Sequence, residues 1–178
     1  MDLSTYKDTS LPTFFLKLRY AFWLIISNIF FLTNIPYPNF IKVFFLKLFG
    51  AKMGKKINIK PWVKIKFPWL VTIGDYVWLG ENVWIDNISE ILIGNNVCIS
   101  QNTILLTGNH NFKKESFDLI TKKIIIEDNV WIAANCLISN GITVKNNSII
   151  LLSSTLTKST ESNSIYQGNP AIKIKNNL

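Results

Sequence analysis

A single histidine occurs in this sequence, and its position gives it the clearest chemical potential of any side chain. His110 follows Gly108-Asn109 near the start of a polar stretch that interrupts a regular apolar repeat. A neutral imidazole can remove a proton from a hydroxyl or an amine near neutral pH, and no other side chain in this stretch is as well suited. The alternative is a histidine that only pins the loop through hydrogen bonds. The sequence therefore predicts either a general base or a loop anchor at residue 110.

The two cysteines carry no comparable signal. Cys98 and Cys136 each lie inside the apolar repeat, which favours small buried residues in a reducing compartment. Two cysteines are too few for a disulfide scaffold, and one histidine with two separated cysteines does not make a metal site within one chain. We therefore expect no metal.

The repeat around the histidine has a period of six residues. An aliphatic residue recurs at this spacing, with two extra residues after Ile85 and a long interruption after Leu105: Ile73, Leu79, Ile85, Ile93, Ile99, Leu105, Ile126, Ile132, Ile138, Val144, Ile150 and Leu156. Small or β-branched residues follow four positions later at nearly every step. A period of six is neither helical nor a strand alternation. It predicts an all-β, parallel β-helix in which each coil has three flat strands of about six residues each. Gly, Asn and Asp after the aliphatic residues are expected at the corners, where they tolerate left-handed backbone angles.

This pattern divides the chain into three parts. Residues 57–161 are expected to form the β-helix, with a protruding loop over residues 106–125, and residues 162–178 form a polar C-terminal tail. Residues 1–56 form an apolar segment with two predicted helices, Pro12–Leu32 and Phe40–Phe49, separated by the breaker Asn34-Ile35-Pro36-Tyr37-Pro38.

The predicted helices have two interpretations that can both hold. They can cover the open edge of the first coil, which would otherwise expose unpaired backbone groups. They can also lie on an anionic membrane face through aromatic insertion and lysine attraction, in which case residues 12–49 make a peripheral contact. The apolar run 21–32 is shorter than the roughly 20 residues of a bilayer span, and no small-residue cleavage site follows it. Cytoplasmic location, peripheral to the inner face of the cell membrane if the helices touch lipid, is the expectation.

Composition narrows the class of partner. The chain is 48% apolar and 17% charged, as expected for a packed domain, and its formal net charge is +8. Such an excess suits nucleic acid, an anionic membrane face or a phosphate-rich cofactor. The lysines are scattered rather than clustered, so we do not expect nucleic-acid binding.

Several short motifs, taken in order, resemble one family. They are Leu48-Phe49-Gly50-Ala51-Lys52-Met53-Gly54, Ile99-Ser100-Gln101, Thr107-Gly108-Asn109-His110-Asn111, Val130-Trp131-Ile132-Ala133, Asn140-Gly141-Ile142-Thr143-Val144, Leu156-Thr157-Lys158 and Gly168-Asn169-Pro170-Ala171. The series is similar to that of the hexapeptide-repeat acetyltransferases, and in particular to the branch assigned to colanic-acid or exopolysaccharide biosynthesis.

The resemblance implies a left-handed β-helix, whereas ordinary parallel crossovers are right-handed. It also implies a homotrimer with acetyl-CoA in a groove between neighbouring subunits, and His110 as the base for the acceptor hydroxyl that attacks the thioester. Carried over by motif, the acetyl-CoA contacts are Trp131, the Ala134 backbone N–H, Leu152, Thr157, Lys158, Asn169 and Pro170. A surface-filling role for Trp131 stays open, because Trp78 and Trp84 occupy equivalent places in the repeat.

Repeat register suggests further site residues. One coil before His110, allowing for the inserted residues, the chain reaches Glu90, whose carboxylate could hold the second imidazole nitrogen or could simply be a solvated corner residue. Asp86 and Asn87 share that corner as candidate substrate ligands, and Asn109 beside His110 is a third.

The predicted function is O-acetylation of a sugar hydroxyl in surface-polysaccharide biosynthesis (exopolysaccharide, capsule or O-antigen), with a free or lipid-linked acceptor. An N-acetyltransferase of an amino-sugar nucleotide is the nearest alternative, because the same base serves an amine. A non-catalytic structural solenoid is a third, although it predicts a regular threonine-rich outer face, whereas residues such as Trp78, Glu81 and Gln101 are mixed. The acceptor and the use of another acyl-CoA are left open.

Overall fold

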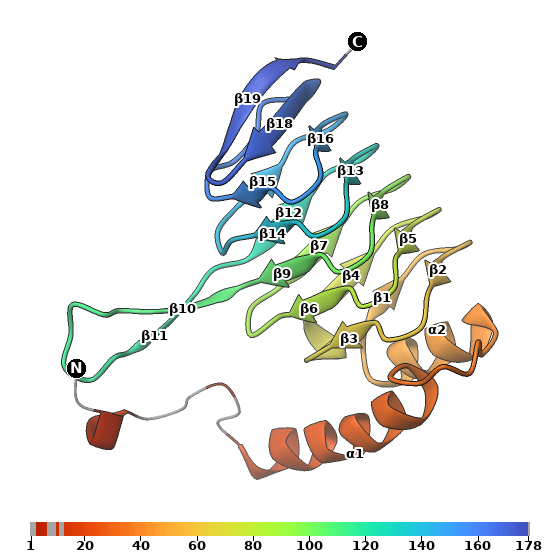
Figure 1. The fold of residues 1–178 in the computed structure, drawn as a ribbon. Helices are drawn as coiled ribbons and strands as arrows, with labels where there is room; N and C mark the ends of the chain where they lie inside the picture. Colours follow the sequence, from red (N-terminus) through yellow and green to blue (C-terminus); the bar gives the residue numbers. More distant parts are fainter. Residues whose placement is uncertain (1–2, 7–9, 11–12, 178) are drawn as a thin grey trace.

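The computed structural model describes residues 3–6, 10 and 13–177 of the chain. The polypeptide winds into a tapering stack of coils whose strands form three sheets, parallel except for the terminal strand of the second (Figure 1). The first sheet contains β1 (Lys52–Met53), β4 (Val71–Ile73), β7 (Ile91–Ile93), β12 (Ile124–Ile126) and β15 (Thr143–Val144). The second contains β2 (Asn58–Ile59), β5 (Trp78–Leu79), β8 (Cys98–Ile99), β13 (Trp131–Ile132), β16 (Ile149–Ile150), β18 (Ser164–Gly168) and β19 (Ala171–Asn176). The third contains β3 (Lys64–Ile65), β6 (Trp84–Asp86), β9 (Ile104–Leu106), β14 (Leu137–Ile138) and β17 (Thr155–Leu156). The predicted left-handed parallel β-helix is confirmed.

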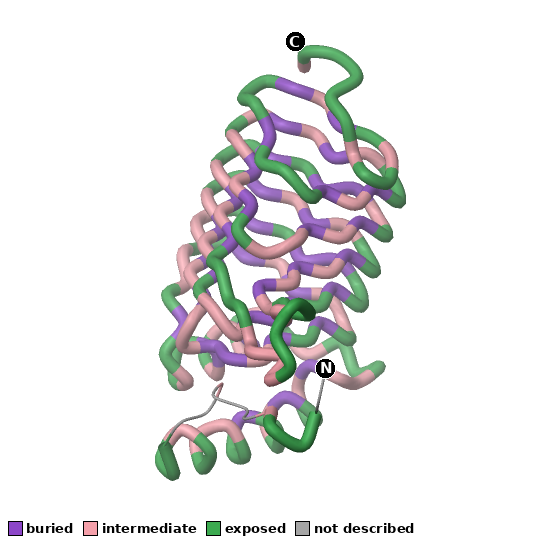
Figure 2. Tube along the Cα trace, turned by 90° about the vertical axis from the view of Figure 1, so that its left-hand side faces the viewer, coloured by how far each residue is buried: buried purple, intermediate pink, exposed green. Residues whose placement is uncertain are grey.

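The six-residue period produces the core. Every aliphatic residue of the repeat is buried, with at most 2% of its surface exposed (Figure 2). Equivalent residues pair from coil to coil, as in the series Ile73, Ile93, Ile126 and Val144 of the first sheet. Because each coil places the same side chain over the one below, the core is a continuous apolar column along the axis.

The corners differ in one respect from the prediction. Most of the described non-glycine residues with left-handed backbone angles are asparagines, namely Asn82, Asn96, Asn102, Asn129, Asn135, Asn147 and Asn163. The glycines that directly follow the aliphatic residues do not have positive φ angles. The prediction that glycine is needed at these positions for a left-handed backbone was therefore wrong. A Cβ on Gly80 would lie 2.5 Å from the Gln101 backbone nitrogen, and one on Gly74 would lie 2.6 Å from the Gly94 oxygen. These glycines allow adjacent coils to approach closely.

Two helices cover the open edge of the first coil. Helix α1 (Phe14–Phe30) begins with Thr13 as its N-cap, and α2 (Asn39–Leu48) follows the proline-containing breaker; the predicted start at Pro12 lies outside the described residues. The buried Trp23 Nε1 donates to the Ile65 carbonyl at 2.7 Å, and the buried Lys42 Nζ donates to the Ile59 carbonyl at 2.9 Å. The helices therefore supply donors to carbonyls that no further coil could satisfy. No helix within the described ranges has the length and apolar content needed to cross a bilayer.

The opposite end of the stack is also ordered. The segment predicted as a polar tail contains β18, which pairs in parallel with β16, and β19, which folds back antiparallel on β18. This hairpin extends the second sheet beyond residue 161 and lies at the end of the solenoid remote from the helices (Figure 1).

Candidate active site

His110 lies on a hairpin that projects from the β-helix (Figure 1). The strands β10 (Gly108–His110) and β11 (Leu119–Thr121) pair antiparallel, with His110 opposite Leu119. The hairpin leaves the coil after the third sheet, where the buried Thr107 hydroxyl donates to the Asp86 carbonyl at 3.1 Å. Thr107 Oγ1 also accepts a hydrogen bond from Ser89 N at 3.0 Å. The predicted loop is therefore a strand pair anchored at its base to the preceding coil.

The imidazole is held on two sides by Phe117. His110 Nδ1 lies 2.9 Å from the Phe117 carbonyl oxygen, and the two rings stack with centroids 4.2 Å apart and planes 3° from parallel. A carbonyl only accepts hydrogen bonds, so Nδ1 must carry the proton. In the neutral ring, Nε2 is then the unprotonated nitrogen. Phe117 has a φ angle of 49°, which is uncommon for a bulky residue.

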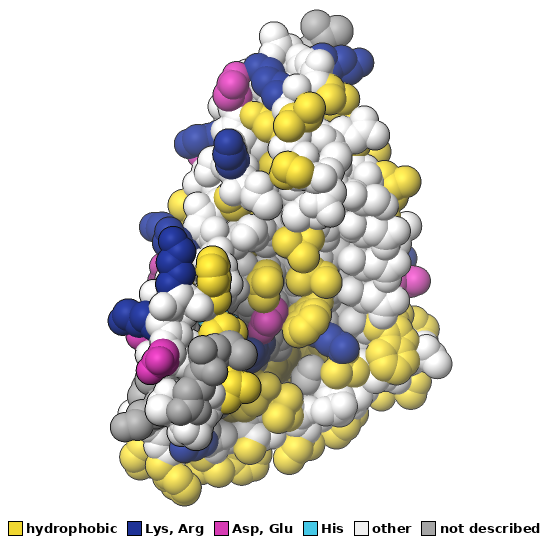
Figure 3. Space-filling model, turned by 60° about the vertical axis from the view of Figure 1, so that its left-hand side comes forward, with side chains coloured by type: hydrophobic (Ala, Val, Ile, Leu, Met, Phe, Trp, Pro, Cys, Tyr) yellow, Lys and Arg dark blue, Asp and Glu magenta, His cyan; other side chains and the backbone are white. Residues whose placement is uncertain are grey.

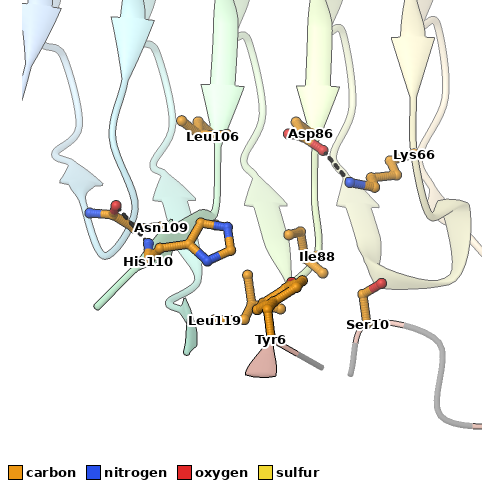
Figure 4. Close-up of a pocket in the computed structure, with 10 residues that line it drawn as sticks. Tyr6, Ser10, Lys66, Asp86, Ile88, Leu106, Asn109, His110 and Leu119 are labelled. Atoms are coloured by element: carbon orange, nitrogen blue, oxygen red, sulfur yellow. Dashed lines mark hydrogen bonds and ion pairs between the residues drawn. The ribbon is translucent and has the colours of Figure 1, made fainter. Parts of the chain in front are cut away.

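The imidazole lines a pocket of about 410 Å³ between the hairpin and the coils (Figure 4). Asn109 and His110 line it from the hairpin, Lys66 and Asp86 line it from two successive coils, and Tyr6 closes one side. The Tyr6 ring meets the imidazole edge-on, with the centroids 5.5 Å apart. Asn109 Oδ1 accepts from His110 N at 2.8 Å.

Asp86 and Lys66 form the charged wall of this pocket. Lys66 Nζ lies 3.0 Å from Asp86 Oδ1, and only 9% of the Asp86 surface is exposed. The ammonium is near enough for an ion pair but is not aligned for a hydrogen bond, and Oδ1 has no other partner among the described residues. A buried carboxylate oxygen with unused acceptor capacity can receive a hydrogen bond from a hydroxyl in the pocket.

The other residues predicted from register lie elsewhere. Asn87 is fully buried, and its amide donates to the Phe67 carbonyl at 2.7 Å and accepts from the Phe67 nitrogen at 3.0 Å. It therefore supports the backbone beside Lys66 and does not line the pocket. Glu90 is exposed and borders a separate small hollow near Lys52. The register argument does not reach His110, because the hairpin leaves the coil directly after the pairing of Leu106 with Asp86.

The sequence patterns did not identify Lys66 on the charged wall of the pocket, or Tyr6 and Phe117, which contact the imidazole. Lys66 could have been found, because it lies one coil before Asp86 and follows Ile65, which pairs with Ile85. Phe117 and Tyr6 carry no local signal, since each meets the imidazole only through the folding of the loop and of the N-terminal segment.

The residues predicted to contact acetyl-CoA lie at other edges of the solenoid. Trp131 is 45% exposed on the second sheet, where its indole Nε1 donates to Ser100 Oγ at 3.0 Å. Ala134, Leu152 and the exposed Asn169-Pro170 pair occupy one corner in successive coils, and Ser153 N donates to the Ala134 carbonyl at 2.9 Å. Thr157 and Lys158 are exposed after the third sheet. None of these residues lines the His110 pocket.

Known proteins share both the sequence and the fold. No family model matches the chain. The curated protein "Putative colanic acid biosynthesis acetyltransferase WcaF" of Escherichia coli (strain K12) is 37% identical over 134 residues, covering 75% of this chain and 74% of that protein.

Solved structures agree in fold. A hexapeptide-repeat acetyltransferase from Vibrio cholerae O1 biovar eltor, in complex with acetyl coenzyme A, superposes with a TM-score of 0.84 at 20% identity, covering 93% of this chain and 91% of that one. A maltose O-acetyltransferase from Clostridium difficile 630 gives a TM-score of 0.85 at 22% identity, covering 94% and 90%. Given its repeat, its fold and its identity with the Escherichia coli protein, the chain belongs to the hexapeptide-repeat acetyltransferase family.

Proposed function

We propose that this protein transfers an acetyl group from acetyl-CoA to a sugar hydroxyl during surface-polysaccharide biosynthesis, with His110 as the general base. The observation that carries the proposal is the hydrogen bond from Nδ1 to the Phe117 carbonyl, because it leaves Nε2 as the basic nitrogen of a ring that lines a polar pocket. The biosynthetic role is supported by the name of the Escherichia coli relative, and the choice of acetyl-CoA by the complex of the Vibrio cholerae structure.

The proposed reaction needs no covalent enzyme intermediate. His110 Nε2 takes the proton of the acceptor hydroxyl while the oxygen forms a bond to the thioester carbonyl carbon. The carbon–sulfur bond then breaks, and the proton held by the imidazole neutralises the departing CoA thiolate. The products are the acetylated sugar and free CoA, and the imidazole returns to its neutral form.

The pocket wall supports a polyhydroxylated acceptor. Asp86 Oδ1 can accept a hydrogen bond from a sugar hydroxyl. Asn109, predicted as a substrate ligand, also lines the pocket, but Figure 4 shows its side chain directed away from the imidazole. The predicted role of Asn87 is not retained, because both polar atoms of its amide are already bonded to Phe67. Glu90 is not retained as the partner of His110, because Nδ1 is bonded to a backbone carbonyl.

The separation of His110 from the predicted acetyl-CoA residues supports a homotrimer. Trp131, Ala134 and Leu152 lie on the second sheet and the corner after it, whereas the His110 hairpin leaves the corner after the third sheet. A groove between two subunits could bring one chain's corner against another chain's hairpin. The exposed Trp131 ring, the stacked corner residues and the exposed Lys158 are suited to an extended thioester arm with a phosphate-bearing end. We place this activity in the cytoplasm, in keeping with the free thiols of Cys98 and Cys136.

The test is a CoA-release assay against sugars, glycans and an amino-sugar nucleotide, comparing wild type with His110→Asn. The asparagine amide keeps a nitrogen donor for the Phe117 carbonyl but has no basic nitrogen at the Nε2 position. We expect kcat to fall by about 10²- to 10⁴-fold with an unchanged circular dichroism spectrum.

Phe112→Ala is the matched control, because Phe112 lies near the tip of the same loop and is 76% exposed. It should retain wild-type turnover. Equal turnover by folded His110→Asn would refute the base assignment, and acetylation of the amino-sugar nucleotide alone would favour the N-acetyltransferase alternative.

A further inference from the structure

A second hollow adjoins the catalytic pocket on the side of the helices. It has a volume of about 260 Å³ and lies between α1 and the first two strands of the third sheet. Its apolar walls come from Tyr20, Leu24, Leu32, Ile65 and Trp84. Lys66 and Asp86 line both this hollow and the His110 pocket, so the two spaces meet at that ion pair. Figure 3 shows the hollowed face, with apolar side chains surrounding acidic and basic groups.

The hollow opens next to an apolar surface on the helices. Trp23 and Leu46 face the solenoid and are buried, whereas α1 and α2 carry large exposed apolar side chains. Six of these are 56% to 80% exposed and make up this apolar surface: Phe14, Phe15, Phe22, Ile25, Phe40 and Phe44. Apolar side chains cover this end of the molecule in Figure 3. We call these six residues the helical apolar face. So many large exposed apolar residues on neighbouring helices mark an interaction surface.

Charge indicates the kind of surface that covers this face. Every charged residue between positions 9 and 74 is basic, so both helices and the first coil carry no carboxylate. A bilayer with anionic lipids offers both a hydrocarbon phase for the aromatic side chains and negative charge for the lysines. A protein partner would need an equally apolar face with an acidic surround, whereas one anionic membrane supplies both features.

The charged side chains that line the hollow also indicate the kind of ligand that it binds. Lys64 and Lys66 line it together with Asp86, whose carboxylate offsets one of the two positive charges. One net positive charge remains between a polar pocket on one side and apolar walls on the other. The polar pocket suits a sugar, the positive charge suits a phosphate, and the apolar walls suit a hydrocarbon chain, joined in that order in one molecule.

We propose that the acceptor is a saccharide joined through phosphate to a membrane lipid, bound with its sugar at His110, its phosphate at Lys64 and Lys66, and its hydrocarbon chain in the hollow beside α1. The helical apolar face rests on the anionic membrane that holds this lipid. This inference deepens the proposed function and rests on it for the position of the sugar, but its binding steps do not require catalysis.

The first experiment therefore measures binding to lipid vesicles by the full-length protein that carries the His110→Asn substitution. Sedimentation with vesicles of phosphatidylglycerol and phosphatidylcholine should capture the protein, and vesicles of phosphatidylcholine alone should capture far less. Ile25→Glu places a carboxylate on the helical apolar face, and we expect at least about a tenfold loss of vesicle affinity. Ile172→Glu is the matched control, because Ile172 is also an exposed aliphatic residue, 65% exposed, but lies on β19 at the opposite end of the solenoid. It should bind as the parent does.

The second experiment tests the hollow with farnesyl phosphate as the probe. The probe should inhibit acetylation of a water-soluble glycan by the wild type, and Lys66→Gln should raise the inhibition constant by about tenfold. Farnesol, which lacks the phosphate, should inhibit weakly in both proteins.

The outcomes separate this inference from the proposed function. A protein that acetylates soluble glycans but binds neither anionic vesicles nor farnesyl phosphate overturns the lipid-linked acceptor and leaves the acetyltransferase proposal intact. Binding to anionic vesicles without acetyl transfer to any acceptor would overturn the proposed function instead. If Ile25→Glu dissociates the oligomer and the parent binds no vesicles, the helical apolar face is a subunit interface and the membrane inference is wrong.

Discussion

Replacing Trp23 with phenylalanine tests whether the helices stabilise the β-helix by satisfying its first coil. The indole is 1% exposed, and its Nε1 donates to the Ile65 carbonyl at 2.7 Å. Trp23→Phe keeps an aromatic ring but leaves this buried carbonyl without a donor, which costs about 1–3 kcal/mol. The smaller ring leaves a cavity that adds about 1 kcal/mol. We expect a total loss of about 2–4 kcal/mol, or about 4–16 °C in Tm for a chain of this size.

The exposed Trp62 provides the matched comparison. Its Nε1 also donates a hydrogen bond, to Asn34 Oδ1 at 2.8 Å, but 38% of the residue is exposed and water can replace the contact. Trp62→Phe should therefore cost less than about 0.5 kcal/mol. Urea unfolding followed by circular dichroism, at one fixed protein concentration, measures both variants. Equal losses for the two variants would refute the idea that buried donors from the helices satisfy the coil edge.

Two further predictions concern the interior. Burial, assisted by the charge of Lys60, holds the pKa of Lys42 below the ordinary lysine value, so the folded protein binds this proton less tightly than the unfolded chain does. The free energy of unfolding should then rise with pH between the lowered and the ordinary pKa of Lys42. Urea titrations at alkaline pH should show this rise in the wild type and not in Lys42→Met. The same pH dependence in both proteins would contradict the prediction. Gly80→Ala should cost about 1–3 kcal/mol, because the new Cβ would lie 2.5 Å from a backbone nitrogen that cannot move away. Gly108→Ala, whose Cβ would meet only the Ile88 side-chain tip at 2.7 Å, should cost less than half as much in the same unfolding assay, and the reverse order would contradict the coil-contact explanation.

The sequence alone determined the solenoid and the position of its histidine. A six-residue period is a local pattern repeated in every coil, and each aliphatic residue meets the same residue type above and below, so the core follows from spacing. The interruption after Leu105 identified the segment that carries His110, and the two apolar helices were visible from their composition and the proline breaker.

Only the tertiary structure decided what surrounds the imidazole. Phe117 reaches Nδ1 because the hairpin turns back on itself, and Lys66 faces Asp86 because adjacent coils align residues 20 positions apart. The register argument selected Glu90 and Asn87 because it assumed that the coil continued, whereas the hairpin leaves the solenoid at Thr107 and follows its own antiparallel pairing. Periodicity specifies contacts between equivalent residues of successive coils. The hairpin, Tyr6 and α1 lie outside the six-residue repeat. The sequence spacing therefore does not predict their contacts, which form only when the whole chain is folded.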